Sequence, residues 1–212
     1  MLKLVKKLLI LIIIAVIVGV FFYEIYLNSR SVPNGAVSLE YPLKNGTFWI
    51  AQSGKTWLAH KTPLEKHADD IVRFPTLASF FRFRDTRLES DVTFGTPIFS
   101  PCLGQVKIVR EGVSDQPIGI KNPAEGSGNT VVVSCNGFDV MMGHFKKNSI
   151  KVKEGDEIKI GEELGQVGNS GNSDGPHLHI QAYSTNALTG EKTPLPMTFE
   201  GRYLYQWDRF TN

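Results

Sequence analysis

From Gly95 onward, the sequence consists of short runs of β-branched residues separated by turn residues, and this pattern limits the fold more than any other feature. Residues 104–109 and 130–135 are two such runs. An Asn136–Gly137 pair separates the second run from a third at 139–144, which is a strong signal for a β-hairpin. Many short strands with frequent turn signals are typical of a sandwich or a barrel. The sequence therefore predicts an all-β fold.

The other candidate strands are shorter or less regular. They lie at residues 47–52, 56–60, 66–74, 96–99, 150–152, 157–160 and 163–167. Residues 75–90 fit either a short helix or an extended loop and are left unassigned. Residues 115–128 contain several Pro and Gly, and they predict a long surface loop of the kind that often borders a site.

The most distinctive stretch is Gly168–Tyr183. Its first half is rich in Gly, Asn, Asp and Pro, which neither a helix nor a central strand tolerates. Its second half alternates, so a strand would point His177 and His179 to one face, with apolar residues on the other. Two imidazoles side by side where a loop meets a strand can bind a metal ion or relay protons. Both histidines are therefore candidate site residues.

Residues 8–23 form an unbroken apolar run that is preceded by Lys3, Lys6 and Lys7. With its apolar neighbours the run approaches the ~20 residues that cross a bilayer as a helix. The lysines before it place the N-terminus in the cytoplasm and the rest of the chain outside. A cleaved signal peptide is the alternative, but bulky aromatic residues stand where small cleavage-site residues would be. The predicted organisation is a transmembrane anchor at 1–30, a spacer at 31–46 and a β domain at 47–212.

The positive charge of the chain comes from its N-terminal segment. Residues 1–30 hold four of the 23 Lys and Arg residues but only one of the 21 Asp and Glu residues, so the remainder has a net charge near −1. Without a basic surface, nucleic-acid binding is not expected. Cys102 and Cys135 are the only cysteines. An even number in an exported domain suggests a disulfide, although two buried thiols would give the same count.

Several motifs occur in an order that resembles a known family. They are Gly95-Thr96-Pro97-Ile98, Gly128-Asn129-Thr130-Val131-Val132, Gly143-His144-Phe145 and, most specifically, the Gly-Asn-Ser-Gly…Gly-Pro-His-Leu-His element of residues 168–179. Over about residues 57–182 the chain resembles the M23 peptidases, also called LytM or lysostaphin-like zinc endopeptidases of bacterial cell walls. The resemblance implies a compact antiparallel β sandwich, of the barrel-sandwich type, with a groove that holds one zinc ion.

The resemblance also implies a set of site residues. The family binds zinc through a His-x-x-x-Asp motif and the second His of His-x-His, and here Asp70 and His179 match the Asp and the distal His. His144 and His177 match the two histidines that do not bind zinc, and would share proton transfer and stabilisation of the tetrahedral intermediate. Two nitrogens and one oxygen leave the fourth tetrahedral position to water, as in catalytic zinc sites. Zinc would lower the pKa of that water and polarise a peptide carbonyl.

The first metal ligand departs from the family pattern, because Lys66 stands four residues before Asp70 and an ammonium group has no free lone pair. His60 and His67 are the candidate substitutes. We favour His60, because a separation of three places His67 on the opposite face of a regular strand from Asp70, unless a bulge intervenes. A shift of register by one residue would make Asp69 the carboxylate ligand instead.

These observations predict a zinc endopeptidase that is attached to the membrane through residues 8–27 and hydrolyses peptide bonds in the stem peptides or cross-bridges of peptidoglycan. We expect a single-pass protein of the bacterial cytoplasmic (inner) membrane, with its domain in the periplasm or cell-wall space. The departure at Lys66 leaves a second interpretation, because some family members have lost ligands and instead bind and activate other cell-wall hydrolases. Those members usually lose the His-x-His pair and the strand-end His as well, whereas this chain retains both.

Overall fold

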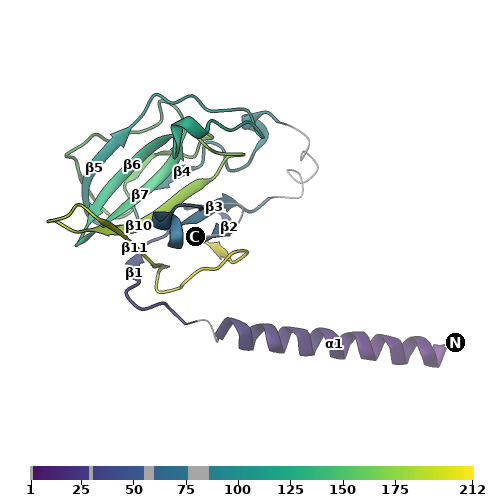
Figure 1. Cartoon of the computed structure of the whole chain (residues 1–212). Coiled ribbons are helices and arrows are strands. Elements are labelled where there is room, and N and C mark those ends of the chain that lie inside the picture. The colour runs from purple at the N-terminus through teal and green to yellow at the C-terminus, as the bar shows by residue number, and fades with distance from the viewer. Residues whose placement is uncertain (1, 29–30, 55–59, 76–85) are drawn as a thin grey trace. The chain divides into compact units, whose positions relative to one another are not determined.

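The chain divides into two compact units, Met1–Pro33 and Asn34–Asn212 (Figure 1). The computed structural model describes residues 2–28, 31–54, 60–75 and 86–212. The first unit contains helix α1 (Leu2–Asn28), where the sequence predicts a transmembrane segment. Within these described ranges no helix has both the length and the apolar character required of a membrane span, so the predicted transmembrane segment is not supported.

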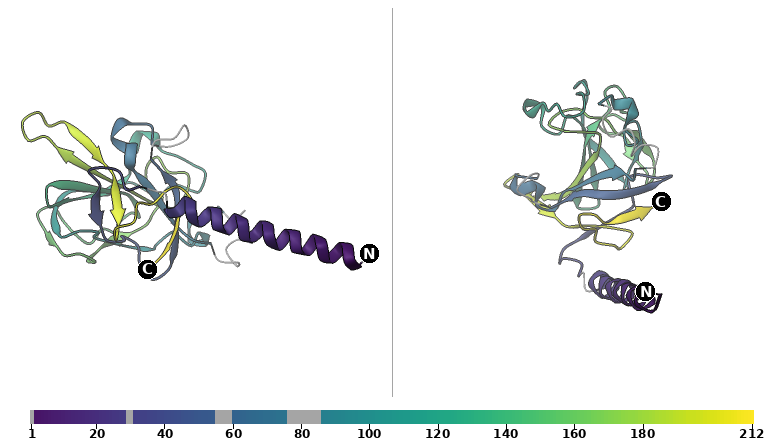
Figure 2. Two further views of the ribbon diagram at one scale, coloured as in Figure 1. Left: turned by 90° about the horizontal axis from the view of Figure 1, so that it is seen from below. Right: turned by 90° about the vertical axis from the view of Figure 1, so that its right-hand side faces the viewer.

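The second unit is built on a large antiparallel sheet (Figure 1). In the described part of the chain this sheet has nine strands, in the order β13-β2-β3-β10-β7-β6-β5-β8, with β11 additionally paired to β10. Its strands are β2 (Thr47–Ser53), β3 (Asp69–Arg73), β5 (Gly104–Arg110), β6 (Asn129–Cys135), β7 (Phe138–Phe145), β8 (Glu157–Ile158), β10 (Leu178–Thr185), β11 (Lys192–Leu195) and β13 (Arg209–Thr211). The turn between β10 and β11 projects from the domain (Figure 2).

Two smaller sheets complete the second unit. Strands β4 (Pro97–Phe99) and β9 (Glu163–Gln166) pair antiparallel, whereas β1 (Val37–Leu39) and β12 (Met197–Phe199) pair in parallel. Short 3-10 helices are η1 (Pro63–His67), η2 (Leu88–Ser90) and η3 (Pro123–Glu125). The buried core draws side chains from all three sheets, among them Ile98, Met142 and Phe199. The three sheets therefore share one apolar core.

The predicted antiparallel β fold is confirmed, most directly by the hairpin that joins β6 and β7 through Asn136 and Gly137. The predicted strand at 66–74 is shorter than expected, because residues 63–67 form η1 and β3 begins only at Asp69. Pro63 at the start of η1 and a capping box between Thr62 and Glu65 favour a helical turn in this segment.

Other expected segments differ from the structure or lie outside it. Residues 150–152 are described but form no strand; the Lys151 N–H donates to the Leu164 carbonyl at 2.9 Å. The predicted strand at 56–60 and the unassigned segment at 75–90 lie mostly outside the described residues.

The boundary of the β domain lies earlier than the sequence predicts. Residues 34–46, taken as part of a spacer, belong to the second unit. Strand β1 pairs with β12, and Leu43 is fully buried. The ring of Tyr41 stacks on Phe210 with centroids 4.2 Å apart. Apolar side chains in a polar-looking segment thus complete the core near the C-terminus, a contact between distant parts of the sequence.

The predicted disulfide is confirmed. Cys102 and Cys135 are bonded, with their Cα atoms 6.1 Å apart. The bond ties the turn before β5 to the end of β6. Both residues belong to the buried core.

Candidate metal centre

Strand β10 sets the position of the candidate site. It pairs with β3 so that His179 lies opposite Asp70, and with β7 so that His179 lies opposite Gly143. Residues opposite each other in an antiparallel pair share a face of the sheet. Leu178 and Ile180 point the other way and are fully buried in the core. The alternation expected for this stretch thus turns His179 and Asp70 toward each other.

His60 approaches the same carboxylate from the segment before η1. Its backbone has φ of 54°, in the left-handed region that non-glycine residues seldom adopt. The Nδ1–H group donates to the Gly54 carbonyl at 2.9 Å, so the other ring nitrogen, Nε2, is turned toward Asp70. The side chain is buried, which holds the imidazole in this orientation.

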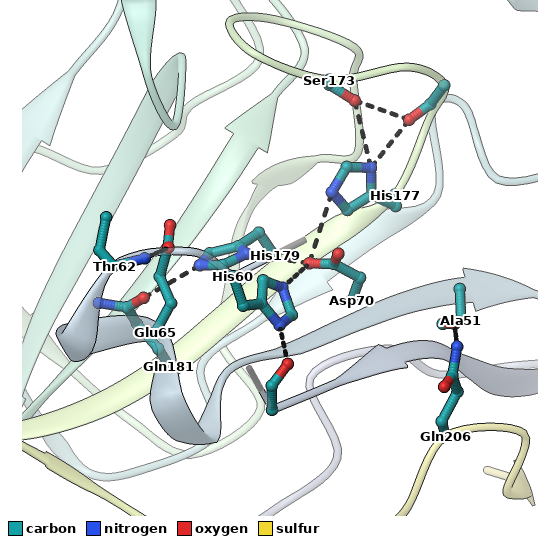
Figure 3. Close-up of polar contacts among 12 residues, drawn as sticks. Ala51, His60, Thr62, Glu65, Asp70, Ser173, His177, His179, Gln181 and Gln206 are labelled. Atoms are coloured by element: carbon teal, nitrogen blue, oxygen red, sulfur yellow. Dashed lines mark hydrogen bonds and ion pairs between the residues drawn. The ribbon is translucent and has the colours of Figure 1, made fainter. Parts of the chain in front are cut away.

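Three histidine nitrogens converge on one oxygen of Asp70 (Figure 3). Asp70 Oδ1 lies 3.0 Å from His60 Nε2, 2.9 Å from His179 Nδ1 and 3.5 Å from His177 Nε2. Burial by itself would raise the pKa of Asp70, but the three histidines hold it well below its ordinary value. The carboxylate is therefore charged and buried among imidazole nitrogens.

The donor set fits a small divalent cation. His179 Nε2–H donates to Gln181 Oε1 at 3.1 Å, and His60 Nδ1–H is similarly engaged, so each ring turns a lone pair toward Asp70. His60 Nε2 is buried without a hydrogen-bond partner of proper geometry, although it lies 3.0 Å from Asp70 Oδ1. Lone pairs facing a carboxylate repel unless a proton or a cation lies between them. Burial acts to lower the pKa of His60, but the contact with Asp70 outweighs it and raises that pKa.

The distances also fit zinc. The three ligand atoms of His60, Asp70 and His179 all lie within 4.8 Å of one another. Tetrahedral zinc with bonds of about 2.0–2.1 Å needs ligand atoms about 3.3 Å apart. The two nitrogens and one oxygen are therefore close enough together to hold one metal ion.

The other residues considered for the metal lie elsewhere. Among the described residues, the group that can hold a metal includes His60 and not His67, which ends η1. Lys66 is exposed on the same 3-10 helix. Asp69 follows the alternation of β3 to the opposite face from Asp70, where burial raises its pKa to about 7 despite a hydrogen bond with Ser53. The structure thus brings together His60, Asp70 and His179.

His144 and His177 lie beside this group. Their ring centroids are 4.6 Å apart, and that of His144 is 6.0 Å from that of His179. His144 Nδ1–H donates to the Ser170 carbonyl at 2.7 Å, and His177 Nδ1–H to the Gly175 carbonyl at 2.8 Å. Burial, with His177 and His179 nearby, lowers the pKa of His144 to about 3. In each ring a backbone carbonyl engages Nδ1, and Nε2 is the nitrogen left to face other groups.

The five residues open into a hollow of ≈ 180 Å³. Besides them it is lined by Glu65, Lys121, Gly126, Ser127 and Asn172. Three of these belong to the loop at 115–128, which the sequence analysis expects to border a site. A second hollow of ≈ 420 Å³ shares Asp70, Lys121, Asn172 and His177 with the first, so the two are continuous.

The partners that orient the histidines are not found by the sequence analysis. Gln181 stands two residues after His179, and the same period of two that pairs His177 with His179 places it on their face. Such partners fix the tautomer and orientation of a metal ligand. The carbonyls of Gly54, Ser170 and Gly175 are backbone groups, and no side-chain motif could reveal them.

Gly128 is expected to be essential for the loop that orients His144. A Cβ atom there would lie 2.3 Å from the Ser170 carbonyl oxygen, which accepts the His144 hydrogen bond, and φ is +62°. Gly128→Ala should cost about 1–2 kcal/mol for the left-handed backbone and about 1–3 kcal/mol more for overpacking. Gly190→Ala is the matched control, because its φ is +71° and nothing lies within 4 Å. Urea unfolding of both variants measures the difference, and equal losses would contradict the predicted clash.

Comparisons with known proteins identify similar sequences and structures. The sequence model of Peptidase family M23 matches residues 87–190. A zinc-containing peptidase from Vibrio cholerae has 19% identity and a TM-score of 0.46, with 75% of this chain and 39% of that chain covered. A variant of the catalytic domain of a prophage-encoded M23 protein from Enterococcus faecalis has 22% identity and a TM-score of 0.46, with 76% and 94% covered. Lysostaphin from Staphylococcus simulans has 19% identity and a TM-score of 0.41, with 74% and 46% covered.

The matched segment contains part of the candidate site. His144, His177 and His179 lie within residues 87–190, whereas His60 and Asp70 come before it. The order of the motifs, the antiparallel β fold and the family match point to the same relationship. Over residues 87–190 the chain matches Peptidase family M23.

Proposed function

We propose that this protein is a zinc endopeptidase that hydrolyses peptide bonds in bacterial peptidoglycan. The observation that carries the proposal is the convergence of His60 Nε2 and His179 Nδ1 on Asp70 Oδ1, at 3.0 and 2.9 Å. The match of residues 87–190 to a peptidase family supports hydrolysis, and the resemblance over residues 57–182 supports peptidoglycan as the substrate. His60 takes the place of the ligand that the family pattern puts at Lys66.

The residues of the chain have separate roles in this proposal. His60, Asp70 and His179 would hold Zn²⁺, which supplies Lewis-acid polarisation of the scissile carbonyl and lowers the pKa of a water molecule. His144 and His177 both line the same hollow, and the Nδ1–H group of each ring is engaged by a backbone carbonyl. His144 and His177 would share proton transfer: the ring that accepts the proton of the attacking water at Nε2 can then donate a hydrogen bond to the tetrahedral intermediate, before that proton passes to the leaving amine.

The proposed location is the periplasm or the cell-wall space. The Cys102–Cys135 disulfide supports it, because structural disulfides persist in oxidising compartments and are rare in the cytosol. Attachment to the membrane through residues 8–27 stays a prediction from the sequence. Peptidoglycan lies in the same space, so enzyme and substrate would meet there.

Metal removal tests the proposed activity. We expect the full-length protein to release new amino groups from purified peptidoglycan, to lose this activity when a chelator removes the metal, and to regain it with Zn²⁺. The physical reason is that the histidines alone can transfer protons but provide no Lewis acid to polarise the scissile carbonyl. A protein that binds one zinc and cleaves nothing would contradict the proposal and favour the alternative, an inactive regulator that binds another hydrolase. Activity that persists without metal would contradict the zinc mechanism.

A further inference from the structure

The face of the large sheet that carries Asp70 continues across β3 to β2 and β13. Val72 is two residues from Asp70 and therefore on the same face. Val72 lies opposite Trp49 on β2, and Trp49 lies opposite Arg209 on β13. Opposite residues in antiparallel pairs share a face, so Trp49 and Arg209 belong to the face that holds the metal centre.

Three aromatic rings gather on this part of the face. Trp49 contacts Phe74 edge-on, with centroids 5.8 Å apart, and Trp207 at 5.3 Å. The guanidinium of Arg209 lies 5.2 Å from the centroid of Phe74. Trp207 is 64% exposed and Phe74 37% exposed. We call Trp49, Phe74 and Trp207 the aromatic shelf.

Trp207 is held in its exposed position by a turn bound to β2. Its backbone φ is 74°, which is unusual for a residue of this size. Its N–H donates to the Ile50 carbonyl at 2.8 Å, and the neighbouring Gln206 Nε2 donates to the Ala51 carbonyl at 2.9 Å (Figure 3). Strained backbone that is held by its surroundings often occurs where a side chain binds a ligand. Because the Trp207 side chain is mostly exposed, packing in the core does not account for its unusual backbone conformation.

A hollow lined by both polar and apolar groups extends from the metal centre toward the shelf. It is the ≈ 420 Å³ hollow that includes Asp70 and His177, and its wall contains Val72, which lies opposite Trp49. Its polar side chains include Gln52, Asp91, Asn172 and Asp174. Phe74 directly follows β3 and is four residues from Asp70, or about 13 Å at about 3.3 Å per residue. An extended ligand could therefore reach both the metal centre and the shelf.

We propose that the aromatic shelf is a subsite for a sugar ring of the glycan strand, remote from the peptide bond that is cleaved. This inference rests on the proposed function, because only a peptide joined to a glycan would occupy both places. A pyranose ring has apolar C–H faces that stack on the negative faces of aromatic rings. Its equatorial hydroxyls match hydrogen-bonding groups such as those of Gln52, Asn172 and Asp91. Aromatic faces beside several hydrogen-bonding side chains are suited to an uncharged sugar, and the one ammonium group of the hollow, that of Lys121, is already paired with Asp174 at 2.7 Å.

The same features disfavour a lipid surface as the occupant. A surface that binds anionic membranes usually combines apolar or aromatic residues with Lys and Arg. Here Arg209 is beside the shelf, but the adjoining hollow contains three carboxylates, of Asp70, Asp91 and Asp174, and only one ammonium group, that of Lys121, which pairs with Asp174 at 2.7 Å. This excess of carboxylates would repel anionic headgroups. Continuity with the metal centre gives a further reason to assign the shelf to the substrate.

Binding of a sugar without a peptide tests the subsite. The probe is a β-1,4-linked tetramer of N-acetylglucosamine, titrated calorimetrically into the full-length protein. We expect saturable binding, about three- to tenfold weaker in Trp207→Ala because one stacking contact is lost. Trp207→Phe retains a ring and should bind nearly as well as the original protein. Leu188→Ala is the surface control, because Leu188 is 96% exposed on the β10–β11 turn.

The outcomes separate this inference from the proposed function. No binding, or equal binding by Trp207→Ala, would overturn the subsite even if peptidoglycan is cleaved. Binding that depends on Trp207, in a protein that cleaves no peptide, would support the subsite and contradict the peptidase proposal. Binding to anionic phospholipid vesicles that depends on Trp207, without saccharide binding, would overturn the sugar assignment in favour of a membrane surface.

Discussion

His179→Ala is expected to remove zinc from the protein and, with it, all peptidase activity. His179 supplies one of two nitrogens in the group and lies 2.9 Å from the only carboxylate oxygen of that group. Loss of an orienting partner alone lowers metal affinity by about 10- to 100-fold. Loss of the ligand itself should therefore lower zinc affinity by more than about 100-fold. Metal content measured by atomic absorption, at equal free zinc, gives the result directly.

His60→Ala and His67→Ala form the matched pair for this experiment. Both remove one imidazole from the same short segment, but only His60 Nε2 lies within contact distance of Asp70. We expect His60→Ala to lose zinc as His179→Ala does, and His67→Ala to retain about one zinc per chain. The reverse result would show that His67 is the ligand and that the segment around η1 rearranges when metal binds. Zinc retained by both variants would contradict the three-ligand centre.

The sequence predicts the part of the fold that depends on local pattern. Residues 129–145 form a hairpin because an Asn-Gly turn joins two β-branched runs, and turn and strands agree. The alternation after Gly175 similarly turns His177 and His179 to one face, since strand geometry has a period of two. These features need only a few neighbouring residues, which a single sequence supplies.

Long-range packing and backbone geometry account for what the sequence does not predict. The parallel pairing of β1 with β12 joins segments about 160 residues apart, and no local pattern encodes it. The approach of His60 to Asp70 depends on a left-handed backbone and on the turn of η1. The family pattern places the first metal ligand at Lys66, on the same predicted strand as Asp70. In the structure Lys66 lies on the 3-10 helix η1, and the strand begins only at Asp69. The sequence therefore offers two histidines, His60 and His67, for the first ligand position, and the folded geometry distinguishes them.

The second large effect is expected for His144 and His177, the two site histidines outside the metal-binding group. His177→Ala and His144→Ala should each reduce cleavage by about 10²- to 10⁴-fold, the usual contribution of general acid–base catalysis. Zinc content should stay near one per chain, because neither residue belongs to the three-ligand group. Turnover of peptidoglycan and metal content, measured on the same preparations, distinguish loss of proton transfer from loss of metal. Leu188→Ala provides the control for unspecific surface effects.

His177 makes this comparison decisive because its Nε2 is 3.5 Å from the oxygen that His60 and His179 approach more closely. If His177→Ala loses zinc together with activity, His177 is a fourth ligand, and the open position required for water is absent. If it retains both zinc and activity, the proton-transfer role belongs to His144 alone or to another group. Loss of activity with zinc retained is the result that the hydrogen bond from His177 Nδ1 to the Gly175 carbonyl predicts, because that bond leaves Nε2 free to accept a proton.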